Sequence, residues 1–254
     1  MAQFFSDVAA IIADYHGYLL KGVGYTMLIS LVGTVAGLVI GLLTGVIRTA
    51  PESRNGFLRG LHRAVKGIIA AYVEVFRGTP MMVQAMVIYW GYAFASGGAT
   101  LPLIPSGMFI VSINTGAYMA EIVRGGIISI DRGQTEGALS IGMSHPQTML
   151  HVIIPQVMRN ILPSVSNEFV INIKDTSVLN VIGVTELYYF AGIIKRQNFQ
   201  SFQTYLVVCV IYFILTFSVT RLLLVIEKKI DGPDSFIIHG SQTTPESIIE
   251  GKEA

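Results

Sequence analysis

Three polar side chains share one face of a predicted helix within an apolar stretch of the chain. Asn114, Tyr118 and Glu121 are spaced at i, i+4 and i+7, which places them on the same side of a helix. Ionisable groups at membrane depth are costly and usually face the interior of a helix bundle. Glu121 could hold a cationic group of a polar solute, and Asn114 and Gln84 could donate hydrogen bonds to an anionic group. The sequence therefore predicts a substrate path lined by Asn114, Tyr118, Glu121 and Gln84.

The Glu121 carboxylate also has a purely structural interpretation. Arg124 follows it by about one helical turn, and Arg77 precedes a predicted break in another apolar stretch. Either arginine could pair with Glu121 inside the bundle without any contact to a solute. Lys174 and Asp175 are adjacent, so they point in different directions around a helix, and they are predicted to serve as gate or interhelix pairing residues. Both interpretations of Glu121 stay open at the level of sequence.

The chain lacks the motifs of an enzyme. It has no Gly-x-x-x-x-Gly-Lys-Ser/Thr phosphate loop, no Gly-x-Ser-x-Gly and no His-Glu-x-x-His. Its five histidines lack metal-ligand spacing, and the single cysteine, Cys209, cannot form an intramolecular disulfide. These patterns predict no catalytic residue, no metal site and no cofactor bound by this chain, and they argue against an intramembrane protease or hydrolase.

Composition indicates a membrane protein. Hydrophobic residues make up 52% of the 254 residues and charged residues only 13%, against about 25% charged residues in soluble domains. The mean hydropathy of +0.61 agrees. A net charge of +1 gives no reason to expect nucleic acid as a partner. The predicted fold is all-α, a polytopic membrane helix bundle in contact with lipid.

Crossing the hydrocarbon core takes roughly 20 mostly apolar residues. Pro80 should kink or break the second such stretch, and the fourth should break near Asp175 and continue as a shorter helix to about Gly192. About five transmembrane helices are therefore expected, over Gly22–Ile47, Val65–Ala95, Met108–Ile128, Val157–Val184 and Tyr205–Ile226.

Flanking segments complete a predicted three-part organisation. Residues 1–21 mix large apolar side chains with Asp7 and Asp14, which favours an N-terminal interfacial helix, with a solvated leader as an equal alternative. Residues 22–229 form the transmembrane domain, and residues 230–254 form a flexible cytoplasmic tail. Basic residues gather in alternate connections, so the positive-inside rule places the N-terminus outside and the C-terminus in the cytoplasm.

A polar segment, residues 134–156, separates the third and fourth apolar stretches. Its first part, Thr135–Met143, is predicted to form a short helix that Gly142 can end. Leu139 and Ile141 supply apolar side chains to this helix. A short helix that projects into the cytoplasm can dock in a groove of a soluble partner.

This segment resembles the EAA loop of ABC-importer permease subunits. The family pattern is Glu-Ala-Ala, three residues, Gly, nine residues and Ile-x-Leu-Pro. At the same spacing this chain has Glu136-Gly137-Ala138, then Gly142, then Val152-Ile153-Ile154-Pro155. Gly137 departs from the pattern and should weaken the helix by about 1 kcal/mol relative to alanine. The resemblance implies that Glu136, Gly137, Ala138, Gly142 and Pro155 couple the chain to an ATPase.

Further segments resemble polar amino acid permeases, namely Val75–Pro80, Tyr118–Ile127 and Lys174–Ser177. The resemblance covers about Gly17 to Lys229. It implies an importer in a prokaryotic plasma membrane, with a second permease copy or paralogue, a cytoplasmic ABC ATPase dimer that binds ATP and Mg²⁺, and an external substrate-binding protein. A different small solute such as an opine is an alternative cargo, whereas a channel subunit would leave the spaced loop unexplained.

Overall fold

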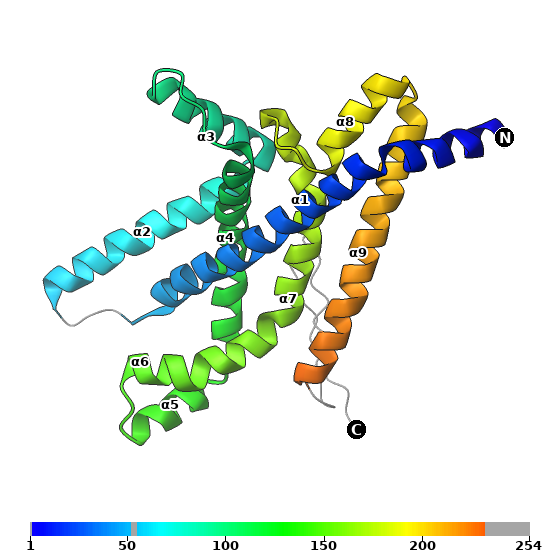
Figure 1. The fold of residues 1–254 in the computed structure, drawn as a ribbon. Coiled ribbons are helices and arrows are strands. Elements are labelled where there is room, and N and C mark those ends of the chain that lie inside the picture. Colours follow the sequence, from blue (N-terminus) through cyan, green and yellow to red (C-terminus); the bar gives the residue numbers. More distant parts are fainter. Residues whose placement is uncertain (1, 52–54, 232–254) are drawn as a thin grey trace.

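The computed structural model describes residues 2–51 and 55–231, and these residues form helices without any strand (Figure 1). Seven longer helices and several short ones follow one another along this part of the chain. In order they are α1 (Ala2–Thr49), α2 (Gly56–Gly78), α3 (Met81–Ala95), α4 (Leu103–Ser129), α5 (Arg132–Ser140), α6 (His145–Thr148), the π-helical η1 (Met149–Ile153), α7 (Ile154–Asp175), the 3₁₀-helical η2 (Thr176–Ile182), α8 (Leu187–Asn198) and α9 (Ser201–Asp231).

Within the described residues, three helices are long and apolar enough to cross a membrane alone: α1, α4 and α9. A further crossing is available from the bent pair His145–Ile182 and Leu187–Asn198, whose parts meet at 57°. The predicted span Val65–Ala95 is divided as expected at Pro80, which lies between α2 and α3. The predicted break near Asp175 is also confirmed, because α7 ends there and η2 follows. The all-α membrane bundle is thus confirmed.

The N-terminal segment differs from the prediction of a separate interfacial helix. Residues 2–21 and the first predicted span form one continuous helix, α1, of 48 residues. At 1.5 Å per residue this helix is about 72 Å long, more than twice the thickness of the hydrocarbon core. Ile11 and Leu19 hold its N-terminal part against α8 and α9 in one apolar cluster. The predicted cytoplasmic tail lies outside the described residues, except that Ile230 and Asp231 complete α9.

Close contact between α1 and α4 forms the centre of the bundle. Four glycines of α1, spaced four residues apart, face α4: Gly33, Gly37, Gly41 and Gly45. A Cβ atom at any of them would come within 2.4–2.8 Å of an α4 side chain. These residues therefore let the two backbones approach more closely than side chains would permit.

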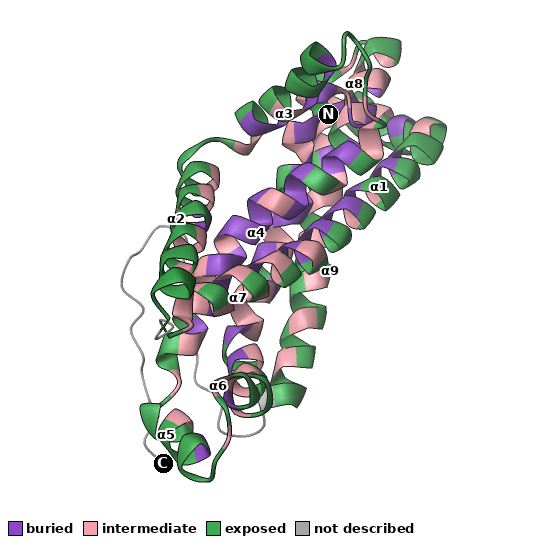
Figure 2. Cartoon of the chain, turned by 90° about the vertical axis from the view of Figure 1, so that its left-hand side faces the viewer, coloured by how far each residue is buried: buried purple, intermediate pink, exposed green. Residues whose placement is uncertain are grey.

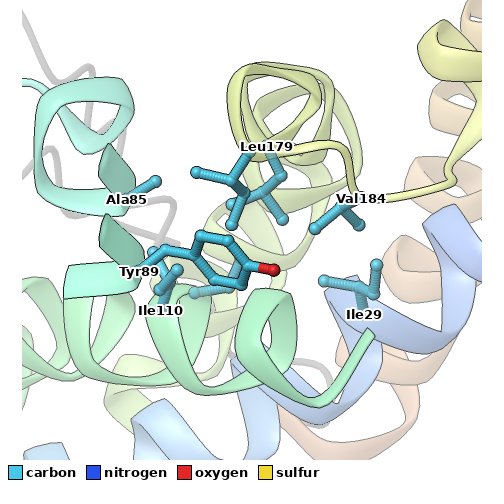
Figure 3. Close-up of a cluster of buried hydrophobic side chains, with 8 residues drawn as sticks. Ile29, Ala85, Tyr89, Ile110, Leu179 and Val184 are labelled. Carbon is cyan, nitrogen blue, oxygen red and sulfur yellow. The ribbon is translucent and has the colours of Figure 1, made fainter. Parts of the chain in front are cut away.

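An apolar cluster joins α1, α3, α4 and η2 at one end of this contact (Figure 3). Ile29, Ile110 and Leu179 are fully buried there. The Tyr89 side chain lies among them, and its hydroxyl donates to the Leu101 carbonyl at 3.3 Å. Buried residues run along α4 and the adjacent part of α1, whereas α9 is mostly exposed or half-buried (Figure 2).

A buried carboxylate fixes the bend between η2 and α8. Gly183 adopts a φ of 87° at the end of η2. Glu186 then caps α8 by accepting hydrogen bonds from the backbone N–H groups of Tyr188 at 2.9 Å and Tyr189 at 2.7 Å. It also accepts a 2.7 Å hydrogen bond from the Tyr212 hydroxyl of α9. The capping carboxylate thus ties the bend to a second helix.

Candidate functional site

The cytoplasmic loop predicted from sequence forms a projecting helical unit, α5 and α6, at one extremity of the molecule (Figure 1). The Asp131 carboxylate caps α5 by accepting from the Gly133 N–H at 2.7 Å. The helix covers Arg132–Ser140, and so begins earlier than the predicted Thr135 and ends earlier than Met143. An aspartate cap with helix-compatible residues behind it accounts for the earlier start.

Gly142 ends this helix, as predicted. Its φ of 88° is left-handed, a conformation that only glycine adopts readily. The Met143 N–H donates to the Ala138 carbonyl at 3.1 Å, and the Gly142 N–H donates to the Leu139 carbonyl at 3.0 Å. These two bonds form a Schellman motif, which satisfies the last carbonyl groups of the helix.

An apolar surface faces outward from this unit. Ala138 is buried and anchors α5, whereas Leu139 is 47% exposed and Ile141 is 79% exposed. Glu136 and Gly137 are also exposed, and a Cβ atom at Gly137 would meet open space. Large exposed apolar groups on a projecting helix are suited to a protein groove.

Pro155 lies where this unit joins the bundle. The chain passes from α6 through the π-helical turn η1 into α7, and Pro155 occupies the first turn of α7. The fixed backbone φ of proline suits the first turn of a helix. A nearly continuous helical path therefore connects α5 and α6 with α7.

Two of the predicted path residues, Gln84 and Asn114, hydrogen bond to each other. The Asn114 amide donates to the Gln84 Oε1 at 2.8 Å, and both side chains are buried. The Gln84 Nε2 donates to the carbonyls of Phe76 and Thr79, each at 2.9 Å. This glutamine therefore caps the broken end of α2 and ties it to α4, so its amide is largely committed within the protein.

Glu121 lies in a cluster with two arginines. Its Oε2 accepts from the Arg124 Nε at 2.9 Å, and its Oε1 pairs with the Arg48 guanidinium of α1. Arg124 is one of the two partners expected from sequence, whereas Arg77, the other, contacts Tyr118 instead. Arg48 is 73 residues away along the chain, so sequence spacing gives no signal for it.

Tyr118 lies in a charged region, and the sequence predicted only some of its members. The Arg77 guanidinium lies 5.6 Å from the centre of the Tyr118 ring. Glu168 and Asp175 of α7 also act electrostatically on Tyr118. Glu168 and Asp175 are seven residues apart, the spacing of one helical face, and this is the signal that could have identified Glu168.

A second polar connection, between α1, α4 and α7, was not predicted. The Asn172 amide donates to the Thr34 hydroxyl at 2.8 Å and accepts from the Thr115 hydroxyl at 3.0 Å. All three side chains are buried. In the ranges 2–51 and 55–231, no three His, Cys, Asp or Glu residues come together in an arrangement that could hold a metal ion.

We expect Glu121→Gln to lower the free energy of unfolding by about 1–3 kcal/mol, between the values for exposed and buried ion pairs. The substitution leaves two half-buried guanidinium groups without their carboxylate. Thermal unfolding in detergent, beside Arg124→Gln and the double variant, measures this coupling. Unchanged stability together with a raised KM for solute would instead assign Glu121 to the solute.

Comparison with known proteins shows which family and which proteins the chain resembles. Residues 37–232 match the profile described as binding-protein-dependent transport system inner membrane component. The glutamine transport system permease protein GlnP of Escherichia coli strain K12 is 36% identical over 211 residues, or 83% of this chain and 92% of that protein. The L-cystine transport system permease protein TcyB of Bacillus subtilis strain 168 is 34% identical, over 83% of this chain and 85% of its own length. A crystal structure of an amino acid ABC transporter with histidines has a TM-score of 0.72 and 32% identity, over 86% of this chain and 96% of that one.

Proposed function

Because the chain belongs to the family of binding-protein-dependent transport system inner membrane components, we propose that it carries a polar amino acid across the membrane. It is the multi-pass permease subunit of an ABC importer and is not an enzyme. The observation that carries the choice of cargo is that relatives named for glutamine and L-cystine each match 83% of this chain. An opine or another small solute is the alternative cargo.

The proposed partners divide the work of transport. A cytoplasmic ABC ATPase dimer would bind ATP and Mg²⁺, an external binding protein would deliver the amino acid, and a second copy of this chain or a paralogue would complete the path. The exposed Leu139 and Ile141 of the projecting unit support docking of α5 into a groove of the ATPase. We place this unit and the C-terminus in the cytoplasm and the N-terminus outside, in accordance with the basic residues of the connections.

Coupling would follow from this docking. Closure of the ATPase dimer moves α5, and the path through α6, η1 and α7 carries that movement into the bundle. The result is a shift between inward-open and outward-open populations, driven by the different affinity of the ATPase for each. Glu136, Gly137, Ala138, Gly142 and Pro155 are the proposed coupling residues.

We propose that the solute path runs along the face of α4 that carries Tyr118. Arg77, Lys174 and Asp175 are exposed beside or near this face, and water or solute could reach them. Gln84, Asn114 and Glu121 border the same face, where their bonds to α2, α4 and α1 hold the path in shape. Direct contact between these three residues and the solute would require those bonds to open.

A reconstituted complex tests this function. The chain, its ATPase and its binding protein are placed in liposomes, and ATP hydrolysis is measured across a panel of amino acids. We expect polar amino acids to stimulate hydrolysis more than apolar ones. A stable complex that responds to an opine and to no amino acid would transfer the proposal to the alternative cargo, and failure to associate with any ABC ATPase would contradict the proposed coupling.

A further inference from the structure

The helix α2 presents two different exposed faces. One is apolar, with Phe57, Leu61, Ile68 and Val75 spaced by four or seven residues and 54–80% exposed. The other carries charged residues at helical spacing, namely Arg59, Arg63, Lys66, Glu74 and Arg77. A third side, with Ile69 and Val73, is buried against Ala120 of α4. Such a helix has one side suited to lipid and another suited to water.

Glu74 lies on the charged face, within the stretch that the sequence predicts to cross the membrane as α2 and α3. It follows Val65, the first residue of the predicted apolar stretch, by nine positions, or about 13 Å along a helix. A carboxylate at this depth is costly in hydrocarbon and faces either protein or a water-filled cavity. Glu74 lies about 100° around α2 from Val75, so it can face a water-filled cavity while Val75, Ile68 and Leu61 contact lipid.

The Glu74 carboxylate is available for a ligand. It is exposed, and it makes no hydrogen bond or ion pair with any residue of the ranges 2–51 and 55–231. Glu121, by contrast, already pairs with Arg48 and Arg124. The sequence offered Glu121 as a candidate acidic contact, but the geometry makes Glu74 the better candidate.

Arg77 complements Glu74 on the same face. It follows Glu74 by three residues, so the two side chains are neighbours on the helix surface. Its guanidinium lies against the Tyr118 ring, in the region proposed as the solute path. An acidic group and a guanidinium separated by one turn match the ammonium and carboxylate groups of an α-amino acid.

We propose that Glu74 lines the translocation path and binds the ammonium group of the transported amino acid, with Arg77 placed to receive its carboxylate. This inference rests on the proposed function and names a contact within it. The acidic group is contributed by α2, immediately before the break at Gly78–Pro80, where the helix end could move during the transport cycle.

Cysteine accessibility tests the placement. Cys209 is the only native cysteine, so Cys209→Ser gives a cysteine-free background in which Glu74→Cys and Val75→Cys are matched neighbours. A cationic, water-soluble thiol reagent is applied to the assembled complex in liposomes. We expect the thiol at position 74 to react about tenfold faster than the thiol at position 75, because the thiolate is the reactive form and lipid disfavours it. Saturating amino acid should slow the reaction of the Glu74→Cys variant alone.

Uptake by Glu74→Gln tests the role. We expect import at limiting amino acid to fall about tenfold, because a charge-assisted bond to the ammonium group is lost. The unfolding temperature should stay unchanged, since the carboxylate has no partner in the described part of the chain. Glu227→Gln, near the end of α9, is the matched control and should import normally.

The outcomes separate the two proposals. Normal import by Glu74→Gln, or equal labelling of the Glu74→Cys and Val75→Cys variants, overturns the role of Glu74 while leaving amino acid import in place. Protection of the position 74 thiol by a second permease copy, without any effect of amino acid, overturns it too. If the wild-type complex imports no amino acid, the proposed function fails first and the ammonium contact fails with it.

Discussion

Leucine in place of Gly41 is expected to prevent the helix bundle from assembling. A Cβ atom at this position would lie 2.4 Å from the Met119 Cβ, 2.7 Å from the Met119 carbonyl carbon and 3.0 Å from the Ala120 nitrogen. Two of these three atoms belong to the α4 backbone, which cannot rotate away. The substitution would therefore push apart the two helices that form the centre of the fold.

A graded series makes this expectation measurable. Gly41→Ala should already cost about 1–3 kcal/mol of stability, in the range of overpacked cores, and the leucine variant should yield no monodisperse protein in detergent. Gly24→Ala is the matched control on the same helix, because a Cβ atom there meets nothing within 4 Å. Normal yield and unfolding temperature for Gly41→Leu would show that α1 and α4 do not pack in this way.

Valine in place of Gly142 is expected to reduce ATP-driven uptake by about tenfold or more while ATP hydrolysis continues. The left-handed backbone at Gly142 ends α5 through two hydrogen bonds. For a β-branched residue this conformation costs on the order of 1–3 kcal/mol, so the last turn of α5 should reorganise. The surface offered by Leu139 and Ile141 would then no longer fit the ATPase.

Gly137 supplies the control for this second prediction. A Cβ atom meets open space at both glycines, but only Gly142 has a positive φ. Alanine is the residue that the family pattern has at position 137, so Gly137→Ala should preserve docking and uptake and strengthen α5 by about 1 kcal/mol. Uptake and hydrolysis are measured in parallel on the same proteoliposomes, with Glu136→Gln as a further coupling variant. Full uptake by Gly142→Val and Glu136→Gln together would contradict coupling through α5.

Local sequence signals predicted the breaks and ends of helices well. Pro80 removes a backbone donor and restricts the residue before it, so its effect depends little on the rest of the fold. Gly142 ends α5 for an equally local reason, since few other residues tolerate its backbone conformation. The four-residue spacing of Gly33, Gly37, Gly41 and Gly45 is likewise a local pattern, and the structure places all four against α4.

Interactions between distant segments could not be predicted in the same way. The separate N-terminal helix was expected from the polar residues Asp7 and Asp14, but packing of Ile11 and Leu19 on α8 and α9 accompanies an unbroken α1. The Arg48–Glu121 pair joins residues that no sequence spacing relates.

The predicted solute path shows the same limit. Helical spacing correctly placed Asn114, Tyr118 and Glu121 along α4, but it gave no information about their partners. Three-dimensional packing decides that Asn114 bonds to Gln84 and Glu121 to Arg48 and Arg124. Glu74 was overlooked because its availability depends on which side of α2 packs against α4, and only the structure shows this.

Uptake of a labelled polar amino acid into proteoliposomes tests the central claim most directly. The vesicles hold the chain and its ATPase with ATP inside, and the binding protein and amino acid are added outside. An importer predicts accumulation above the external concentration, which is lost when either ATP or the binding protein is omitted. Entry that merely equilibrates and does not depend on ATP would indicate a channel and contradict the account.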